Sequence, residues 1–226
     1  MDAAPPRVLA IDTALAACSV AVLAGGAIAA ERRETMTRGH AERLLPLVRD
    51  AMASTGLAFE ALDLIAVTIG PGHFTGLRVG LAAAQGLSLA SDRPLAGVTT
   101  LEAVAAAAPV PDERLVVALE SKRADLYIQV FEGGRASGAP MALTPEDFAR
   151  SPLLPSSPLV LAGDGAARLE TVLAASGCLV RRVGPEIPDA ATVARVAASR
   201  HGTPAALAPL PLYLRPPDVT LPKAPR

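Results

Sequence analysis

The chain has 226 residues, of which 51% are hydrophobic and 19% are charged. This composition excludes the intrinsically disordered class, and the length suits one large domain or two small ones. Aromatic residues contribute only 3%, there is no Trp, and the formal net charge is −1. These values argue against aromatic stacking with the bases of single-stranded nucleic acid and against electrostatic binding of RNA phosphates. We therefore expect any contact with RNA to be indirect.

The cysteines and the apolar runs bear on the compartment of the protein. Cys18 and Cys178 lie far apart and form no Cys-x-x-Cys pair, so we predict core residues, with neither a zinc site nor a disulfide framework. The N-terminal residues, with Pro5-Pro6, lack the basic and apolar regions of a signal peptide. The longest apolar stretch, Val79 to Ala90, is short for a bilayer span and contains Gln85. We therefore expect a cytoplasmic protein that is neither exported nor membrane-spanning.

In chain order, the first half begins with three strands. An apolar strand ends at Asp12, and a second strand runs into Gly25-Gly26, which is typical of a tight hairpin to a third strand. Hydrophobic periodicity and turn residues then predict helix 40–54, strand 64–69, a Gly70-Pro71-Gly72 turn, helix 74–90, strand 95–98 and helix 99–108.

The second half repeats this order. Without gaps, residues 8–27 align with residues 116–135 at an offset of 108, which places Asp12-Thr13 on Glu120-Ser121. The identical pairs are Val8/Val116, Ala10/Ala118, Ala16/Ala124, Val22/Val130, Gly25/Gly133 and Gly26/Gly134. The later elements are predicted as a short helix from Pro145, strand 159–162, a Gly163-Asp164-Gly165 turn, helix 166–176, strand 179–183 and helix 189–201.

The repeat sets the expected fold class and domains. It predicts an α/β chain of two βββαβαβα halves, residues 1–108 and 109–226, divided near Pro109 and Pro111. Each half is expected to bury a mixed sheet between its helices.

The stretch from Gly70 to Gly80 carries the most specific motif, Gly-Pro-Gly-His-Phe-Thr-Gly-Leu-Arg-Val-Gly. It follows a strand and opens a helix, so its N–H groups and the helix dipole suit an anion. The glycines also suit close packing of two helices, with Pro71 stiffening the turn. Neither Lys nor Ser/Thr follows at P-loop spacing, so packing is the favoured interpretation.

Helices 40–54 and 74–90 are predicted to offer a surface to another chain. The second helix is apolar nearly all round, whereas a surface helix normally has a polar face. The outward residues of the first helix are expected to be His40, Arg43, Leu47 and Asp50. Its inward residues are expected to be Ala41, Leu44, Leu45, Val48, Ala51 and Met52. We interpret the pair as half of a helix bundle that lacks its partner.

Side chains suited to catalysis are few. His40, His73 and His201 form no i, i+4 pair, so no helical metal site is expected. The chain has no Gly-x-Ser-x-Gly elbow, which argues against a serine hydrolase. Asp12 and Glu120 share a strand-end context and would suit Mg²⁺ if they faced each other. Acids at strand ends more often bond local backbone N–H groups.

Several motifs together resemble the TsaB (YeaZ) family. They are Leu9-Ala10-Ile11-Asp12-Thr13, His40-Ala41-Glu42-Arg43-Leu44-Leu45-Pro46, the Gly70 to Gly80 block, Glu120-Ser121-Lys122-Arg123 with Tyr127, and Tyr213-Leu214-Arg215-Pro216. The resemblance covers nearly the whole chain, and the glycine block is its specific part. His73 stands where the family usually has Ser, Glu120 stands where it usually has Asp, and the tail after Pro216 is irregular.

The resemblance implies a duplicated actin-like ATPase fold of the ribonuclease H-like class, with a nucleotide cleft between the halves. The residues implied at that cleft are Asp12, Thr13, Gly70, Gly72, Glu120, Gly163 and Gly165. It implies no metal site and no tightly bound cofactor, so that ATP or ADP with Mg²⁺ would bind only weakly or within a complex.

The resemblance also implies a non-catalytic subunit that binds and activates TsaD. That transferase places a threonylcarbamoyl group on the adenosine next to the anticodon of tRNAs reading ANN codons. TsaE would supply the ATPase, and tRNA would be contacted only indirectly. The implied partner surface consists of His40, Arg43, Leu44, Leu47, Gly76, Gly80, Ala83 and Leu87. The alternatives are a homodimeric scaffold using the same helices, and a peptidase or small-molecule kinase of the same fold.

Overall fold

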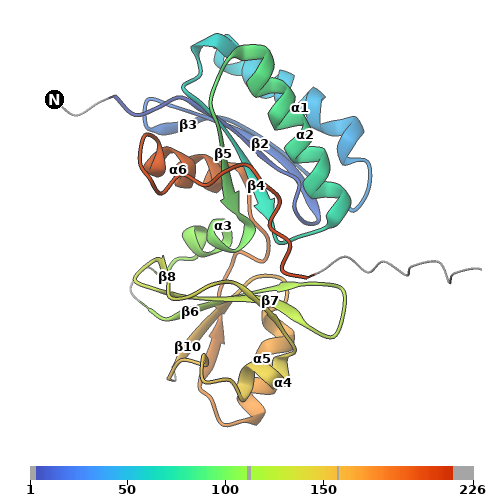
Figure 1. Cartoon of the computed structure of the whole chain (residues 1–226), viewed down its shortest axis with the longest axis vertical. Coiled ribbons are helices and arrows are strands. Elements are labelled where there is room, and N and C mark those ends of the chain that lie inside the picture. The colour runs from blue at the N-terminus through green and yellow to red at the C-terminus, as the bar shows by residue number, and fades with distance from the viewer. Residues whose placement is uncertain (1–3, 111–112, 157, 216–226) are drawn as a thin grey trace, which may run out of the picture.

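The computed structural model describes residues 4–110, 113–156 and 158–215, which form two lobes built on one β-sheet each (Figure 1). The first sheet has the strand order β3-β2-β1-β4-β5. The elements of this half are β1 (Val8–Asp12), β2 (Ala17–Ala24), β3 (Ala27–Thr35), α1 (His40–Thr55), a 3-10 turn (Phe59–Ala61), β4 (Leu64–Gly70), α2 (Phe74–Ser91), β5 (Leu95–Thr99) and α3 (Thr100–Ala107). Strands β1 to β3 are antiparallel, whereas β4 and β5 run parallel to β1.

The second sheet has the order β11-β10-β6-β7-β8, with β9 paired to β7. Its half consists of β6 (Leu115–Glu120), β7 (Leu126–Glu132), β8 (Arg135–Ala136), β9 (Met141–Leu143), α4 (Pro145–Ala149), β10 (Leu159–Ala162), α5 (Ala166–Ala175), β11 (Val180–Arg182) and α6 (Ala190–Arg200). Again the first two strands are antiparallel, and the next long strand, β10, is parallel to the first. The predicted element order is confirmed, with β8 and β9 in the place of a single third strand.

Helices and sheets alternate in layers through the molecule (Figure 1). Helices α1 and α2 cover the outer face of the first sheet, where Leu9 and Ile11 of β1 point toward them. Helices α4 and α5 cover the outer face of the second sheet. Helices α3 and α6 lie between the two sheets and contact each other.

The two central helices are exchanged between the lobes. Helix α6 belongs to the second half, yet its Ala190, Ala194 and Ala197 pack with Val8 and Ala10 of the first sheet. Helix α3 belongs to the first half, yet its buried leucine and valine pack with strand β6 of the second sheet. The sequence predicts the extents of both helices but places each on its own half. The predicted domain boundary near residue 108 stays a prediction.

The strand register corrects the predicted repeat alignment. At an offset of 108, Val8 aligns with Val116, but Val8 faces α6 and Val116 faces the outer helices. In the second strands, β2 and β7, the residues that align at an offset of 108 do face the outer helices in both lobes. Because side chains alternate with a period of two, β1 and β6 align at an odd offset, and one extra residue between β6 and β7 restores 108. The counterpart of Glu120 is therefore Thr13, and the predicted pairing with Asp12 is wrong.

The chain after α6 returns along the first lobe as a C-terminal strap (residues 206–215). Its backbone is hydrogen-bonded to Gly97 of the edge strand β5 and to Ile69 of β4. Arg215 then forms an ion pair with Asp125 of the second lobe, with Nε and Oδ2 2.7 Å apart. The strap therefore covers one sheet edge and connects the two lobes.

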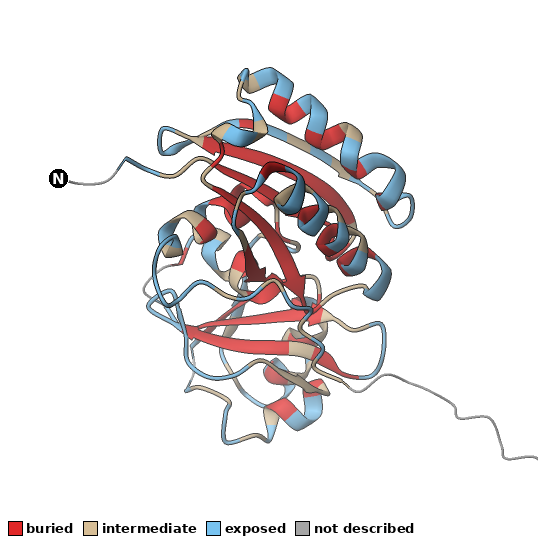
Figure 2. Cartoon of the chain, turned by 45° about the horizontal axis from the view of Figure 1, so that its top comes forward, coloured by how far each residue is buried: buried red, intermediate tan, exposed pale blue. Residues whose placement is uncertain are grey.

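Burial follows the layers. The central strands of both sheets are almost entirely buried, whereas the edge strands β3, β8 and β11 have mostly exposed or half-buried residues. The outer helices expose one side (Figure 2). Cys18 is buried, as predicted, while Cys178 is half-buried.

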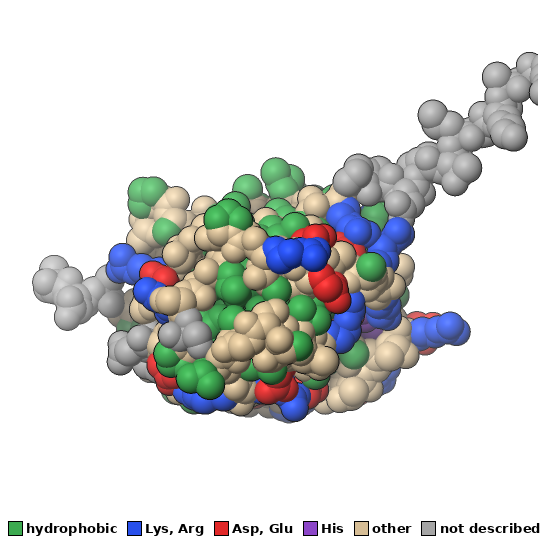
Figure 3. Space-filling view, turned by 90° about the horizontal axis from the view of Figure 1, so that it is seen from below, with side chains coloured by type: hydrophobic (Ala, Val, Ile, Leu, Met, Phe, Trp, Pro, Cys, Tyr) green, Lys and Arg blue, Asp and Glu red, His purple; other side chains and the backbone are tan. Residues whose placement is uncertain are grey.

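On the lower face, hydrophobic side chains gather near the centre with charged side chains around them (Figure 3). Across the described ranges, no helix combines the length and apolarity needed to cross a bilayer. The motif residue Pro216 and the tail after it lie outside the described residues.

Candidate functional site

Glycines bring the start of α2 onto the end of β1. A Cβ at Gly72 would lie 2.4 Å from the carbonyl oxygen of Ala14. Cβ atoms at Gly76 and Gly80 would lie 2.2 and 2.3 Å from atoms of Thr13. The Thr13 hydroxyl donates a hydrogen bond to the carbonyl oxygen of Gly76 at 2.8 Å. Gly76 and Gly80 are four residues apart in α2, so they lie on one face of the helix. The motif is therefore a packing device, and its partner is the end of a strand rather than a second helix.

Asp12 is enclosed at the end of β1. It is 1% exposed, and its Oδ1 accepts hydrogen bonds from Thr68 Oγ1 at 2.8 Å and from Ala14 N at 3.1 Å. Burial raises the pKa of this carboxyl to about 6, although the two hydrogen bonds oppose the rise. Asp12 therefore accepts hydrogen bonds from groups of its own chain, which is the more common role of an acid at the end of a strand.

The glycine turn before α5 also packs against the backbone at the end of a strand. A Cβ at Gly163 would lie 2.2 Å from the carbonyl oxygen of Ala118, and Gly165 N donates to that oxygen at 3.0 Å. Between these glycines, Asp164 Oδ1 accepts a hydrogen bond from Glu120 N at 2.8 Å. Burial raises the pKa of Asp164 to about 6. The turn therefore fixes the end of β6.

The residues predicted for a nucleotide cleft do not form one open site. The side chains at the end of β1 are buried, and a Cβ at Gly70 would lie 2.9 Å from the carbonyl oxygen of Leu212 in the strap. Of the predicted set, Gly72 and Glu120 line the cavity that opens between the lobes. A nucleotide held by all seven residues does not fit this arrangement. Within the described ranges, no three His, Cys, Asp or Glu side chains are grouped to hold a metal ion.

The cavity between the lobes has a volume of about 600 Å³. On the first lobe it is bounded by the starts of α1 and α2, and on the second lobe by the end of β6. Its lining includes His40, His73, Arg38 and Lys122. The sequence motifs contain His40, His73 and Lys122, but no sequence signal placed Arg38 or Lys122 in a site, because only the packing of the two lobes brings them together.

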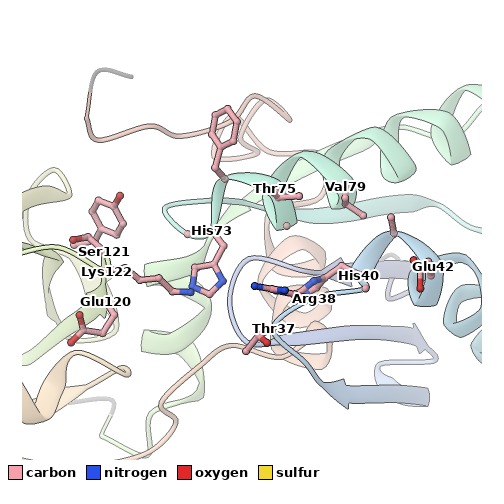
Figure 4. A pocket seen from close by; sticks show the side chains of 16 residues that line it. Thr37, Arg38, His40, Glu42, His73, Thr75, Val79, Glu120, Ser121 and Lys122 are labelled. Carbon is pink, nitrogen blue, oxygen red and sulfur yellow. The ribbon is translucent and has the colours of Figure 1, made fainter. Parts of the chain in front are cut away.

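Basic side chains converge in the middle of this cavity. Lys122 extends toward the His73 ring from the second lobe, and Arg38 and His40 lie on the other side of that ring (Figure 4). Burial lowers the pKa of His73, and the positive charges of Lys122 and His40 lower it further. His40 is 8% exposed, and its Nε2 is buried with no hydrogen-bond partner in the described chain.

Most residues predicted for the partner surface lie inside the protein. His40, Leu44, Leu47, Gly76 and Gly80 are buried, and Ala83 and Leu87 are half-buried against the core under α1 and α2. Leu47 is 5% exposed, because it shares the sheet-facing stripe of α1 with Leu44 and Val48. Arg43 is exposed as predicted, and its Nε donates to Glu34 Oε2 at 2.8 Å.

The exposed side of the two helices carries a different set of apolar residues. On α2, Ala82, Gly86 and Leu89 point outward, and Leu89 is 86% exposed. A Cβ at Gly86 would meet no atom within 4 Å. On α1, Leu45 is 54% exposed, although the sequence predicts it inward. We call Leu45, Ala82, Gly86 and Leu89 the outer helix surface. Exposed turns along these helices are visible in Figure 2.

Sequence comparisons connect the chain to known proteins. A family model described as TsaD, tRNA N6-adenosine threonylcarbamoyltransferase, matches residues 28–143. The chain is 38% identical over 123 residues to the tRNA threonylcarbamoyladenosine biosynthesis protein TsaB of Escherichia coli, which covers 54% of this chain and 53% of that protein. The match thus spans about half the length of this curated relative. An uncharacterised protein of Mycobacterium tuberculosis is 34% identical over 213 residues, covering 93% of this chain and 92% of that protein.

Structural comparisons extend over nearly the whole chain. YeaZ from Pseudomonas aeruginosa superposes with a TM-score of 0.80 at 30% identity, covering 92% of this chain and 100% of that one. Component A of (R)-2-hydroxyglutaryl-CoA dehydratase from Acidaminococcus fermentans superposes with a TM-score of 0.50 at 10% identity, covering 86% of this chain and 98% of that one. The second likeness concerns the fold alone.

Two lobes of matching strand order, facing each other across a cavity, define a protein of the duplicated actin-like ATPase fold. The predicted fold class is confirmed. Within that fold class, the 30% identity to YeaZ over 92% of this chain identifies the family. The chain belongs to the TsaB (YeaZ) family.

Proposed function

We propose that this chain is a non-catalytic cytoplasmic subunit of tRNA threonylcarbamoyladenosine biosynthesis that binds and activates a TsaD homologue. Relatives named for this biosynthesis support the pathway. The match to the TsaD family model supports kinship with the proposed partner. The partner would modify the adenosine next to the anticodon of tRNAs reading ANN codons, with TsaE as the ATPase of the cycle. In this proposal, tRNA meets the chain only through the complex.

The observation that carries the proposal is Leu89, an 86% exposed leucine on the outer helix surface. Burying such a side chain on association contributes about 1.5–3 kcal/mol. The open face at Gly86 lets a partner backbone approach closely. Helices of 16 and 18 residues can also present the roughly 800 Å² per partner that a stable interface needs.

The non-catalytic part of the proposal is supported by what the strand-end groups already do. Asp12 is held by Thr68 and by the backbone, and the glycine turns are filled by carbonyl groups of the same chain. ATP or ADP with Mg²⁺ would therefore bind weakly, or only within a complex. Calorimetry that showed micromolar ATP affinity, about 8 kcal/mol of binding free energy, with loss of that affinity in Asp12→Asn, would contradict this.

The test is Leu89→Arg in the full chain, mixed with its TsaD homologue. We expect association at least about tenfold weaker and less tRNA modification in a reconstituted mixture. The free energy of unfolding should change by no more than about 0.5 kcal/mol, because the side chain is exposed. The matched control is Leu179→Arg, because Leu179 is 71% exposed on the second lobe. This control should bind and support modification normally.

Two outcomes would overturn the proposal. One is normal association and modification with Leu89→Arg. The other is a chain that only pairs with itself through the outer helix surface and ignores the TsaD homologue, which is the homodimeric alternative. Leu47→Arg, the variant that sequence alone suggests, cannot serve here, because it would place a charge in the core beside Leu44.

A further inference from the structure

Two glycines of the first lobe form a seat for the C-terminal strap. A Cβ at Gly97 would lie 2.8 Å from the carbonyl oxygen of Ala208, and a Cβ at Gly70 would lie 2.9 Å from that of Leu212. Gly97 N also donates a hydrogen bond to the carbonyl oxygen of Leu207 at 2.9 Å. Because backbone segments approach this closely only where a side chain is absent, the strap is held in one position on the first lobe.

The end of the strap packs on the start of α2. The ring centroids of Tyr213 and Phe74 lie 5.8 Å apart, and the Tyr213 hydroxyl accepts a hydrogen bond from Arg78 Nε at 3.3 Å. The Arg78 guanidinium lies 3.7 Å from the centre of the Phe74 ring. Phe74 also lines the cavity between the lobes. The strap therefore follows the first lobe as far as Tyr213 and reaches the edge of this cavity.

Two residues further on, the strap meets the second lobe at Asp125. The Asp125 side chain is only 5% exposed, and its Oδ1 accepts a hydrogen bond from the Ser121 hydroxyl at 3.0 Å. Its Oδ2 is buried and has no aligned hydrogen-bond donor among the residues that the structure describes. Arg215 Nε lies 2.7 Å from this oxygen, so the contact is an ion pair. Because a buried carboxylate without a counter-charge is strongly unfavourable, the second lobe needs a cation that the strap carries.

The Asp125–Arg215 pair joins the lobes beside the cavity. Helices α3 and α6 contact each other between the two sheets and connect the lobes there, whereas the cavity of about 600 Å³ separates them. Lys122 and Tyr127, which precede and follow Asp125 in the chain, both line the cavity. Figure 1 shows the strap running from the first lobe to the second. Two bodies that are joined in one place and separated in another can open as a hinge.

We propose that the Asp125–Arg215 ion pair is a clasp that holds the two lobes at one opening. The glycine seat fixes the position of the strap, and thereby of Arg215, on the first lobe. The Ser121 hydroxyl fixes the carboxylate on the second lobe. Breaking the pair should therefore let the lobes move apart about α3 and α6 while the strap stays in its seat. The proposal concerns this chain alone, so it does not depend on the partner proposed above.

The experiment measures the distance between the lobes in the full chain by electron paramagnetic resonance. Spin labels are attached at Ala41→Cys on α1 and Glu146→Cys on α4, because both positions are exposed. The half-buried Cys178 is replaced by Ser, and the buried Cys18 is kept. In this background, wild-type clasp residues should give one narrow distance distribution.

Two variants break the clasp in different ways. Arg215→Ala leaves the buried carboxylate without a cation, whereas Asp125→Asn removes the buried charge and keeps the shape of the side chain. Both should give a broader distribution with longer distances. The matched control is Arg182→Ala, because Arg182 pairs with Glu170 at the same distance of 2.7 Å but within the second lobe. This control should leave the distribution unchanged.

Amide exchange at Gly97 shows whether the strap stays in place. The Gly97 N–H bonds to the strap, so its exchange rate in both clasp variants should stay within about threefold of the wild-type rate. An unchanged lobe distance in Arg215→Ala and Asp125→Asn overturns the proposal. Strongly accelerated exchange at Gly97 in Asp125→Asn overturns it as well, because the strap would then leave its seat and could not act as a fixed anchor.

Discussion

The starts of α2 and α5 bring a helix onto the end of a strand in the same way but with different side chains. In the first lobe, Gly72 and Gly76 admit the strand-end backbone, and the neutral hydroxyl of Thr13 donates to α2. In the second lobe, glycines again admit a strand-end carbonyl, but the counterpart of Thr13 is Glu120, which pairs with Arg168 of α5. In both lobes the helix start lies close to the backbone at the end of a strand. The polar side chains at this contact differ between the lobes, so we expect glycine substitutions to lower the free energy of unfolding more than charge substitutions do.

Gly76→Ala should have the largest effect on this comparison. Its Cβ would lie 2.2 Å from the Thr13 carbonyl oxygen, so α2 must shift or strain, at a cost of about 3 kcal/mol or more in the free energy of unfolding. The matched control is Gly86→Ala on the same helix, which meets open space. It should stabilise the helix by roughly 0.5–1 kcal/mol. Urea unfolding of both variants measures this, and equal free energies for the two would refute the packing interpretation.

Asp12→Asn should change how stability depends on pH. Burial raises the folded-state pKa of Asp12 to about 6, above the value of about 3.9 for an unfolded chain. The folded state therefore binds more protons in this window, so the contribution of Asp12 is greatest below about pH 4 and is lost as the pH rises through about 6. The free energy of unfolding of the variant, relative to wild type, should grow by about 2–3 kcal/mol between pH 4 and 7.

Asp164 offers the matching test in the second lobe. Its pKa is also raised to about 6 by burial, but the residue is only half-buried. Asp164→Asn should therefore shift the pH profile in the same direction and by less. Urea unfolding at several pH values records both profiles. A profile for Asp12→Asn that runs parallel to wild type would show that this carboxyl titrates normally in the folded protein.

Glu120→Gln should have the smallest effect. The Glu120–Arg168 pair is partly exposed, with side-chain exposures of 26% and 39%, and such pairs contribute about 0–1 kcal/mol. Thermal unfolding in low and high salt should show a small loss that shrinks as salt rises, because salt screens the pair. A loss comparable to that of Gly76→Ala would mean that charge, rather than backbone approach, holds α5 in place.

The sequence was sufficient for the order and extent of the elements, because each depends on local periodicity and turn residues. Strand β4, its glycine turn and helix α2 appear where predicted, and so do β10, its turn and α5. The repeat predicts the strands correctly but not which side of the sheet each residue of β6 faces. A single extra residue between β6 and β7 changes which side of the sheet Glu120 occupies, and an alignment without gaps cannot detect it.

The site was less predictable, because it depends on contacts between distant segments. The sequence predicts Leu47 on the surface because helix 40–54 has apolar residues on more than one side, so its buried side is ambiguous without the sheet beneath it. The resemblance places Gly76 and Gly80 against a partner, whereas the structure packs them against Thr13 of the same chain. Arg38 and Lys122 share a cavity only because the lobes are packed together.

The exchange of α6 also has a consequence for synthesis. Strands β1 and β2 are among the first residues to leave the ribosome, yet one face of their sheet is covered by alanines at 190–197. The strap reaches the β5 edge later still, at Leu207. Until then, the nascent first lobe exposes an apolar face and an unpaired strand edge, both of which favour aggregation. The first lobe to be made is thus the last to be completed, and its protection during translation depends on whatever covers that face in the meantime.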